Sequence, residues 1–267
     1  MSVDNTTYSI GVFDSGIGGL SVANAIYSLL PNESIIYFAD TARVPYGLRP
    51  KYQIKQFSEE ITAFLLEKKC KMIVVACNTA TAAALNDLRK KWPHIPIVGM
   101  EPAVKPAAEA TQNNKVGVLA TLSTINSERY GLLMHRFASD VTVFENPCIG
   151  LVPLIETGKL KDAETKNLLY SILNPMLEAK IDTLVLGCTH YPFILPLLSD
   201  ILGGSIEIID PAPAIARQVE RLLIKKKRLK SKKNQPIYHF YASGSYPKLD
   251  LFTTIPFSFD FDKNPLK

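Results

Sequence analysis

The 267-residue chain lacks any uninterrupted apolar run close to the roughly 20 residues that a membrane-spanning helix needs. It has only four cysteines, too few for the dense disulfide framework of a small secreted protein. Residues 1–7 show neither the basic segment nor the long apolar segment of a secretory signal. These absences argue against the membrane and secreted classes, and we expect a cytoplasmic protein.

The chain also lacks an evenly spread charge of one sign. Its formal net charge is +5, but seven basic residues fall within 225–233, and without these seven the remaining chain sums to −2. No aromatic residues alternate with these lysines, as a stacking platform for nucleic acid would require. We interpret the segment as a solvated helix end and loop, and we expect no nucleic-acid partner and no membrane partner.

Short apolar runs alternate with stretches of helical apolar spacing, which is the pattern of parallel α/β units. Strands are expected at 8–13, 34–38, 72–76, 95–99, 115–120, 141–145, 183–186, 206–209 and 237–241. Helices are expected at 20–30, 53–69, 103–111, 123–137, 162–179, 192–202 and 212–227.

The same pattern restarts after residue 101. It predicts an α/β fold of two pseudo-symmetric, doubly wound domains with mainly parallel sheets. The first domain is expected to comprise residues 1–98 and 210–267, and the second residues 99–209. Ligands bind off the carboxyl ends of such strands, so we expect the active site in the cleft between the domains.

Two stretches share one design, in which a cysteine stands where a buried strand gives way to a helix. In residues 72–85 this cysteine is Cys77, and in residues 183–198 it is Cys188. Unpaired N–H groups at a helix N-terminus attract anions, and the same field lowers the pKa of a thiol. Two such cysteines predict two acid/base groups that face one small substrate and move a carbon-bound proton between its faces.

Polar residues follow each of these cysteines and interrupt an otherwise apolar sequence. Asn78 and Thr79 follow the first, and Thr189 and His190 follow the second. Such residues either cap a helix or hydrogen-bond a carboxylate or amine of a substrate. We favour the second interpretation.

The closeness of His190 to Cys188 permits two other hypotheses. A metal site would need more ligands than this pair supplies, so none is expected. A cysteine hydrolase with His190 as its base is an alternative, but it leaves Cys77 without a function. Cys70 and Cys148 lack this strand-end setting, and we interpret both as structural.

Residues 14–19 form a glycine-rich turn between an expected strand and an expected helix. The turn is an imperfect dinucleotide fingerprint, because Ser21 stands where the third glycine belongs, and a nucleotide-binding module is an alternative. We interpret the glycines as allowing close backbone approach to a small polar ligand. Asp14 and Ser15 would then hold an ammonium group or tune a neighbouring base.

A loop at residues 40–47 follows the second expected strand. It is either a turn capped by Asp40 or a functional segment. The functional interpretation places the backbone of Tyr46 and Gly47, together with the charge of Arg43, at the mouth of the cleft.

Four of these motifs, taken in chain order, resemble the aspartate/glutamate racemase family and, within it, the enzymes that act on glutamate. The resemblance covers nearly all of residues 8–242, and each motif alone would be weak. The motifs are Phe13–Leu20, Asp40–Gly47, Ala76–Thr81 and Gly187–Pro192.

The resemblance implies a racemase that interconverts L-glutamate and D-glutamate by a two-base proton transfer at Cα, with Cys77 and Cys188 as the acid/base thiols. It implies that Asp14 assists Cys77 and that His190 assists Cys188, with Glu156 as a further carboxylate near Cys188. Substrate contacts are implied for Asp14, Ser15, Tyr46, Gly47, Asn78, Thr79, Thr189 and His190.

The resemblance also implies an enzyme that needs no cofactor, supplies D-glutamate for peptidoglycan synthesis and forms a homodimer. Without pyridoxal phosphate as an electron sink, such an enzyme relies on preorganised electrostatics and on exclusion of water. A racemase of aspartate or of another amino acid would keep both cysteines and is a further alternative.

Overall fold

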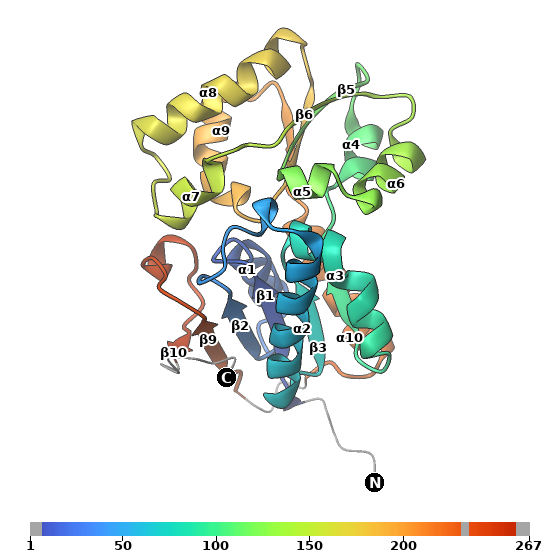
Figure 1. Ribbon diagram of the computed structural model, residues 1–267, viewed down its shortest axis with the longest axis vertical. Coiled ribbons are helices and arrows are strands. Elements are labelled where there is room, and N and C mark those ends of the chain that lie inside the picture. The colour runs from blue at the N-terminus through green and yellow to red at the C-terminus, as the bar shows by residue number, and fades with distance from the viewer. Residues whose placement is uncertain (1–6, 231–234, 260–267) are drawn as a thin grey trace.

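The computed structural model describes residues 7–230 and 235–259. It contains two lobes, which lie one above the other in Figure 1. We call the lower one the first lobe and the upper one the second lobe. In the described part of the chain, no helix is long and apolar enough to cross a membrane.

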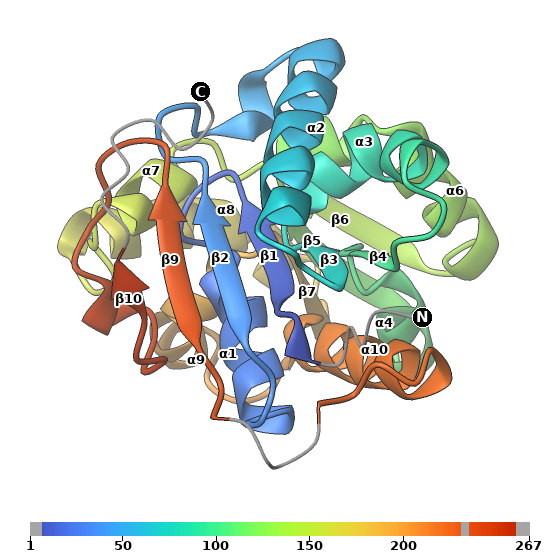
Figure 2. The same cartoon turned by 90° about the horizontal axis from the view of Figure 1, so that it is seen from below.

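The first lobe is built on a sheet of parallel strands with helices on both faces. Its strands are β1 (Ile10–Asp14), β2 (Ile35–Ala39), β3 (Met72–Val75), β4 (Ile97–Gly99), β9 (Tyr238–Ala242) and β10 (Ser258–Phe259), in the order β10-β9-β2-β1-β3-β4. Its helices are α1 (Leu20–Leu29), α2 (Lys51–Glu67), α3 (Asn78–Lys91) and α10 (Ala212–Lys225), with 3-10 turns η2 (Tyr46–Leu48) and η4 (Leu249–Leu251). Helices α2 and α3 cover one face, and α1 and α10 cover the other (Figure 2).

The second lobe has a smaller sheet of the same kind. Its strands are β5 (Lys115–Ala120), β6 (Thr142–Asn146), β7 (Thr183–Gly187) and β8 (Glu207–Ile209), all parallel, in the order β6-β5-β7-β8. Its helices are α4 (Val104–Ala110), α5 (Leu122–Ile125), α6 (Glu128–Phe137), α7 (Leu151–Glu156), α8 (Ala163–Glu178) and α9 (Leu195–Leu202), with the 3-10 turn η3 (Tyr191–Ile194).

Four strands of each lobe are connected in the same way. The order β2-β1-β3-β4 in the first lobe matches β6-β5-β7-β8 in the second. In both, the chain goes to one side of its first strand and then returns to the other side, which places a topological switch point beside that strand. The predicted α/β class with two doubly wound parallel sheets is confirmed. The domain boundaries, residues 1–98 with 210–267 and residues 99–209, stay a prediction.

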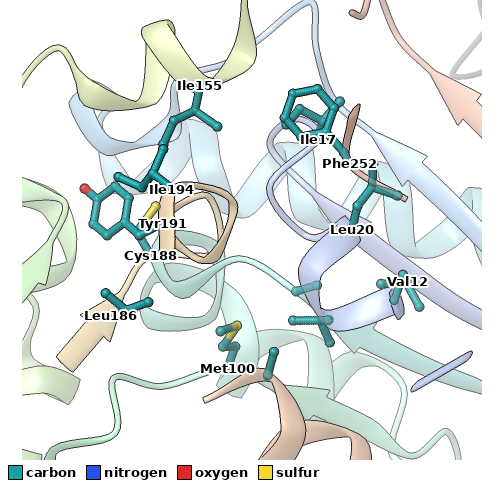
Figure 3. Packing of buried hydrophobic residues seen from close by; sticks show 14 of the residues in the cluster. Val12, Ile17, Leu20, Met100, Ile155, Leu186, Cys188, Tyr191, Ile194 and Phe252 are labelled. Carbon is teal, nitrogen blue, oxygen red and sulfur yellow. The ribbon is translucent and has the colours of Figure 1, made fainter. Parts of the chain in front are cut away.

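The two lobes share a buried apolar core, which Figure 3 shows from close by. Val12 and Leu20 of the first lobe and Leu186 and Ile194 of the second lobe belong to one cluster, with Met100 among them. In the described residues the chain passes between the lobes twice, once after β4 and once after β8. The shared core fixes the lobes against one another.

Two expected helices are divided in the structure. The helix expected at 123–137 is interrupted at Ser127, because its Oγ accepts a hydrogen bond from Tyr130 N at 3.1 Å and caps α6. The helix expected at 192–202 begins as the turn η3, and α9 starts only at Leu195. Pro196 has no N–H to donate to the carbonyl four residues earlier, so the first turn cannot be a regular α-helix.

The basic segment is solvated only in part, so that interpretation was wrong for two of its residues. Arg228 Nη1 donates to the carbonyl of Lys71 at 2.8 Å. Lys230 is buried, and its Nζ donates to Ser34 Oγ at 2.9 Å. These bonds join the end of α10 to the first sheet. Lys232 and Lys233 lie outside the described residues.

Candidate active site

One pocket between the lobes contains both predicted cysteines. Cys77 follows β3 and Cys188 follows β7, two strands that occupy equivalent places in their sheets. The cavity of this pocket is small, with a volume of about 20 Å³. It is lined by Ser15, Pro45, Tyr46, Gly47, Cys77, Asn78, Thr79, Thr121, Val152, Cys188, Thr189 and His190. Two cysteines from different lobes therefore line the same cavity.

Cys77 caps the N-terminus of α3. Its backbone is extended, with φ −140° and ψ 120°, and its Sγ accepts a hydrogen bond from Ala80 N at 3.4 Å. The thiol also donates to Ser15 Oγ at 3.9 Å. The N–H of Ala80 at the helix end does lower the pKa of this thiol, as expected. Burial and the neighbouring Asp14 carboxylate outweigh it, so the expected net decrease was wrong and the pKa is raised well above the ordinary value.

Asp14 lies at the end of β1, buried next to Cys77. Its Oδ2 accepts hydrogen bonds from Gly16 N at 3.2 Å and Gly19 N at 3.0 Å. Its Oδ1 has no hydrogen-bond partner among the residues that the structure describes. Burial raises the pKa of this carboxyl, and the nearby charge of His190 opposes that increase. Asp14 thus has one oxygen fixed by the glycine turn and one oxygen free for a ligand or a proton.

Cys188 has a different set of neighbours, dominated by a histidine. His190 Nδ1 lies 3.6 Å from Cys188 Sγ, and its Nε2 lies 2.5 Å from Glu156 Oε1. Burial lowers the pKa of His190, but hydrogen bonds with Cys188 and Glu156 outweigh it and raise the pKa well above its usual value. The ring therefore lies between a sulfur and a carboxylate, and both of these neighbours favour its protonated form.

The turn after Cys188 is not a helix N-terminus, so that part of the prediction was wrong. His190 is followed by the 3-10 turn η3, and the regular helix α9 begins only at Leu195. Cys188 therefore does not cap an α-helix. The electrostatic partner of Cys188 is the imidazole of His190 and not a helix end. The two cysteines match in fold position but differ in what surrounds them.

Glu156 connects the two lobes at the site. Its Oε1 accepts the N–H of Ile17 at 2.9 Å, from the glycine turn of the first lobe, while it also bonds His190. Gly16 and Gly18 make this approach possible, because a β carbon on either would overlap the side chain of Glu156 or His190, respectively. The glycines therefore admit side chains of the second lobe, where we had expected a ligand.

The loop at 40–47 contributes residues 45–47 to the pocket wall, whereas the charge of Arg43 is paired with two carboxylates. Tyr46 is buried, and its hydroxyl donates to Asp40. Arg43 bonds Asp40 through Nε at 2.7 Å and Glu60 through Nη1 at 2.6 Å. The expectation of an Arg43 charge at the mouth of the cleft was wrong, because these carboxylates pair it. Tyr46 and Gly47 do line the pocket.

Two threonines of the second lobe belong to the site and were not predicted. Thr121 directly follows β5 and lies 2.8 Å from Thr79, hydroxyl to hydroxyl, and Thr124 lies 3.0 Å from Thr121. Thr121 holds the place in the second lobe that Ser15 holds in the first, immediately after the central strand and level with the cysteine of the neighbouring strand. That equivalence was the available signal. Val152, at the start of α7, also lines the pocket without having been expected.

Some buried polar atoms of the pocket residues have no hydrogen-bond partner within the described part of the chain. Asn78 is buried, and neither its Oδ1 nor its Nδ2 has a hydrogen-bond partner within the described residues. A buried amide without partners costs free energy unless a ligand supplies them. In the same part of the chain, no group of three or more His, Cys, Asp or Glu side chains is placed to hold a metal ion.

Comparison with known proteins identifies the class of this α/β fold and its two-thiol pocket. The family model described as Asp/Glu/Hydantoin racemase matches residues 10–219, so the chain belongs to that racemase family. Within the family it groups with the glutamate racemases. It is 55% identical over 214 residues to the glutamate racemase of Pseudomonas paraeruginosa, covering 80% of this chain and 81% of that one.

Solved structures agree with this placement. Glutamate racemase from Francisella tularensis, in complex with D-glutamate, superimposes with a TM-score of 0.82 at 34% identity, over 96% of this chain and 97% of that chain. The Escherichia coli glutamate racemase, in complex with L-glutamate and the activator UDP-MurNAc-ala, gives a TM-score of 0.81 at 33% identity, over 92% of each chain.

Proposed function

We propose that the protein interconverts L-glutamate and D-glutamate without a cofactor, by a two-base transfer in which Cys77 and Cys188 exchange the α-proton. The observation that carries the proposal is that Cys77 and Cys188, from opposite lobes, line the same pocket. The glutamate complexes of the Francisella tularensis and Escherichia coli relatives support glutamate as the substrate. We further propose, as the motif resemblance implies, that the enzyme works in the cytoplasm and supplies D-glutamate for peptidoglycan synthesis.

The unpartnered polar groups of the pocket are suited to an amino acid. The Asn78 amide offers donors and an acceptor, and the free Oδ1 of Asp14 can accept from an ammonium group. Ser15 and Thr189 add hydroxyl groups, and Tyr46 and Gly47 add backbone groups to the wall. In this proposal these residues bind the α-amino and carboxylate groups and fix Cα between the two sulfur atoms.

The proton balance of the reaction is simple. One cysteine, as a thiolate, removes the α-proton, so that a C–H bond breaks and an S–H bond forms. The opposite cysteine, as a thiol, gives its proton to the other face of the same carbon, so that its S–H bond breaks and a new C–H bond forms. The roles reverse for the other enantiomer, and buried donors stabilise the charge that develops between the two steps.

The two supporting groups favour opposite protonation states. The pKa of Cys77 is raised by burial and by Asp14, which keeps Cys77 as a thiol in the resting enzyme. His190 is held as an imidazolium between Cys188 and Glu156 and donates to the Cys188 sulfur when that sulfur is a thiolate. In this proposal Cys77 has a proton to donate before substrate enters, and the His190 ring stands ready to donate to the sulfur of Cys188.

Chiral chromatography in deuterium oxide tests the function. Purified enzyme given L-glutamate, with no cofactor added, should yield D-glutamate that carries deuterium at Cα, because the donating thiol exchanges with solvent. Label-free D-glutamate would contradict base exchange, and absence of D-glutamate would refute the function. Parallel reactions with L-aspartate and L-alanine test the substrate, since faster turnover of either would assign the enzyme to another amino acid.

The domain division and the assembly belong to the same proposal. We infer that the chain folds as two domains, residues 1–98 with 210–267 and residues 99–209. We also infer that two copies of the chain associate as a homodimer. Light scattering coupled to gel filtration measures the assembly, and a mass near that of one chain would contradict the dimer.

A further inference from the structure

A short piece of the C-terminal segment touches both lobes beside the site. We call residues 249–253 the strap. The strap comprises η4 and the two residues after it, and it belongs to the segment that follows β9 of the first lobe. Phe252 is the one aromatic residue of the strap and is only 3% exposed. The mechanism proposed above gives this segment no role.

The strap is anchored to the first lobe through Asn24 of α1. Asn24 Nδ2 donates to the carbonyl of Phe252 at 2.7 Å, and Thr253 Oγ1 donates to Asn24 Oδ1 at 2.5 Å. Figure 3 shows the Phe252 side chain next to Ile17 and Leu20, in the same buried cluster. Phe252 is thus held in two ways, by the hydrogen bonds of the Asn24 side chain with residues 252 and 253 and by apolar packing of its own ring.

On the other side, the strap contacts the second lobe at two places. The rings of Phe252 and Phe193 meet edge to face, with centroids 5.0 Å apart. A β carbon on Gly158 would lie 3.2 Å from Leu251 Cδ1, so the strap also lies against the turn that ends α7. Aromatic pairs of this geometry contribute about 0.5–1.5 kcal/mol beyond the area that they bury.

Both contact points lie close to the His190–Glu156 pair. Phe193 belongs to η3, and its N–H donates to the carbonyl of His190 at 3.2 Å. Gly158 lies two residues after Glu156. Ile17, beside Phe252 in Figure 3, donates its N–H to Glu156 at 2.9 Å. The strap therefore contacts each segment that sets the position of this pair.

We propose that Phe252 is a positioning residue for the Cys188 half of the reaction, acting through Phe193 to hold His190 between Cys188 and Glu156. The role in catalysis rests on the function proposed above, whereas the effect on His190 does not. Phe252 touches no substrate in this assignment. It restrains the turn η3, and a displacement of about 1 Å at a proton-transfer group is enough to slow such a reaction about 100-fold.

A double-mutant cycle tests the coupling. We expect Phe252→Ala and Phe193→Ala each to lower kcat about 10- to 100-fold with little change in KM, and Phe252→Ala with Phe193→Ala to lower it no further than either alone. Phe252→Leu, which keeps most of the apolar volume, should recover much of kcat. Losses that multiply in the double variant would overturn the proposal.

Phe257→Ala is the matched control. Phe257 is a buried phenylalanine of the same C-terminal segment, but its ring contacts are with Tyr37 and Phe240 of the first sheet. The Phe257→Ala variant should lose about as much free energy of unfolding as Phe252→Ala, while its kcat stays near that of the wild type. If Phe252→Ala does not fold, Asn24→Ala releases the anchor and leaves both rings in place, and it should lower kcat in the same sense. Wild-type kcat in a folded Asn24→Ala or Phe252→Ala variant contradicts the proposal.

A proton NMR measurement works without turnover and separates this proposal from the function. The short bond between His190 Nε2 and Glu156 should give a low-field proton resonance, assigned by its absence in His190→Asn. We expect the resonance to persist in Phe257→Ala and to shift or broaden in Phe252→Ala. An unchanged resonance in Phe252→Ala overturns the positioning role. A wild-type enzyme that shows the resonance but does not racemise glutamate refutes only the function.

Discussion

The two lobes place a cysteine at the same point of the same strand order, yet they surround it with groups of opposite charge. Cys77 lies beside the buried carboxyl of Asp14 and caps α3. Cys188 lies beside His190 and precedes a 3-10 turn. The fold thus places each cysteine, whereas a few neighbouring side chains give each thiol a different environment. A symmetric arrangement of strands supports an unsymmetric pair of thiols.

The largest expected effect is the loss of either sulfur. Cys77→Ala and Cys188→Ala should each lower kcat at least about 10³-fold, because each removes one of two proton-transfer groups. The assay is chiral chromatography of D-glutamate formed from L-glutamate. Cys70→Ala is the control, since Cys70 is buried away from the pocket and burial raises its pKa to about 12. Substantial turnover by either of the first two variants would remove that cysteine from the mechanism.

The supporting charges come next, and they test whether each lobe serves its own cysteine. Asp14→Asn and His190→Asn should each lower kcat about 10²-fold. L-Glutamate and D-glutamate have equal free energies, so any variant must lower kcat/KM equally in both directions. Rates alone therefore cannot show which of the two proton transfers is slowed, but isotope effects can. With α-deuterated substrates, Asp14→Asn should enlarge the isotope effect for one enantiomer and His190→Asn for the other. Enlargement for the same enantiomer in both variants would break the assignment.

A smaller loss is expected where the glycine turn meets the second lobe. Gly16→Ala and Gly18→Ala should push Glu156 and His190 out of place, lowering kcat about 10-fold and the free energy of unfolding by about 1–3 kcal/mol. Gly131→Ala is the control, because a β carbon there meets nothing within 4 Å in the described structure. It lies within α6 and should gain about 0.5–1 kcal/mol. Full activity in Gly18→Ala would contradict the close approach.

The smallest expected effect is a pH dependence of stability that belongs to the Cys188 side. The pKa of His190 is raised in the folded protein, so its contribution is complete below its ordinary pKa of about 6.5 and is lost as the pH rises through the folded value. As the pH rises above about 6.5, the free energy of urea unfolding should fall more for the wild type than for His190→Asn. The exposed His94→Asn should follow the wild-type curve. Parallel curves for the wild type and His190→Asn would refute this linkage.

Much of the fold was predictable because apolar periodicity reports burial directly. The strands that carry Cys77 and Cys188 are fully buried and therefore appear as continuous apolar runs. The strand β10 was missed, since two exposed residues give no such pattern. The division of the expected helix 123–137 at Ser127 depends on one hydroxyl bond, which spacing alone does not show.

The site was predictable in its members more than in its electrostatics. The motifs placed Ser15, Asn78 and Thr189 in the pocket, where the structure has them. The direction of the Cys77 pKa was wrong, because the depth of burial and the neighbouring carboxylate depend on tertiary structure. Thr121 was missed because a lone threonine after a strand has no motif of its own, and only the matching strand orders identify it.

The two passages of the chain between the lobes have a consequence for how substrate enters. The shared core holds the lobes together in this conformation, and the two covalent connections, each with a proline (Pro102 and Pro211), restrict any opening to a rotation about the line that joins them. Such a rotation would part Glu156 from Ile17 as the pocket opens. We therefore expect that solvent reaches the reacting carbon only after the groups that move its proton have been separated.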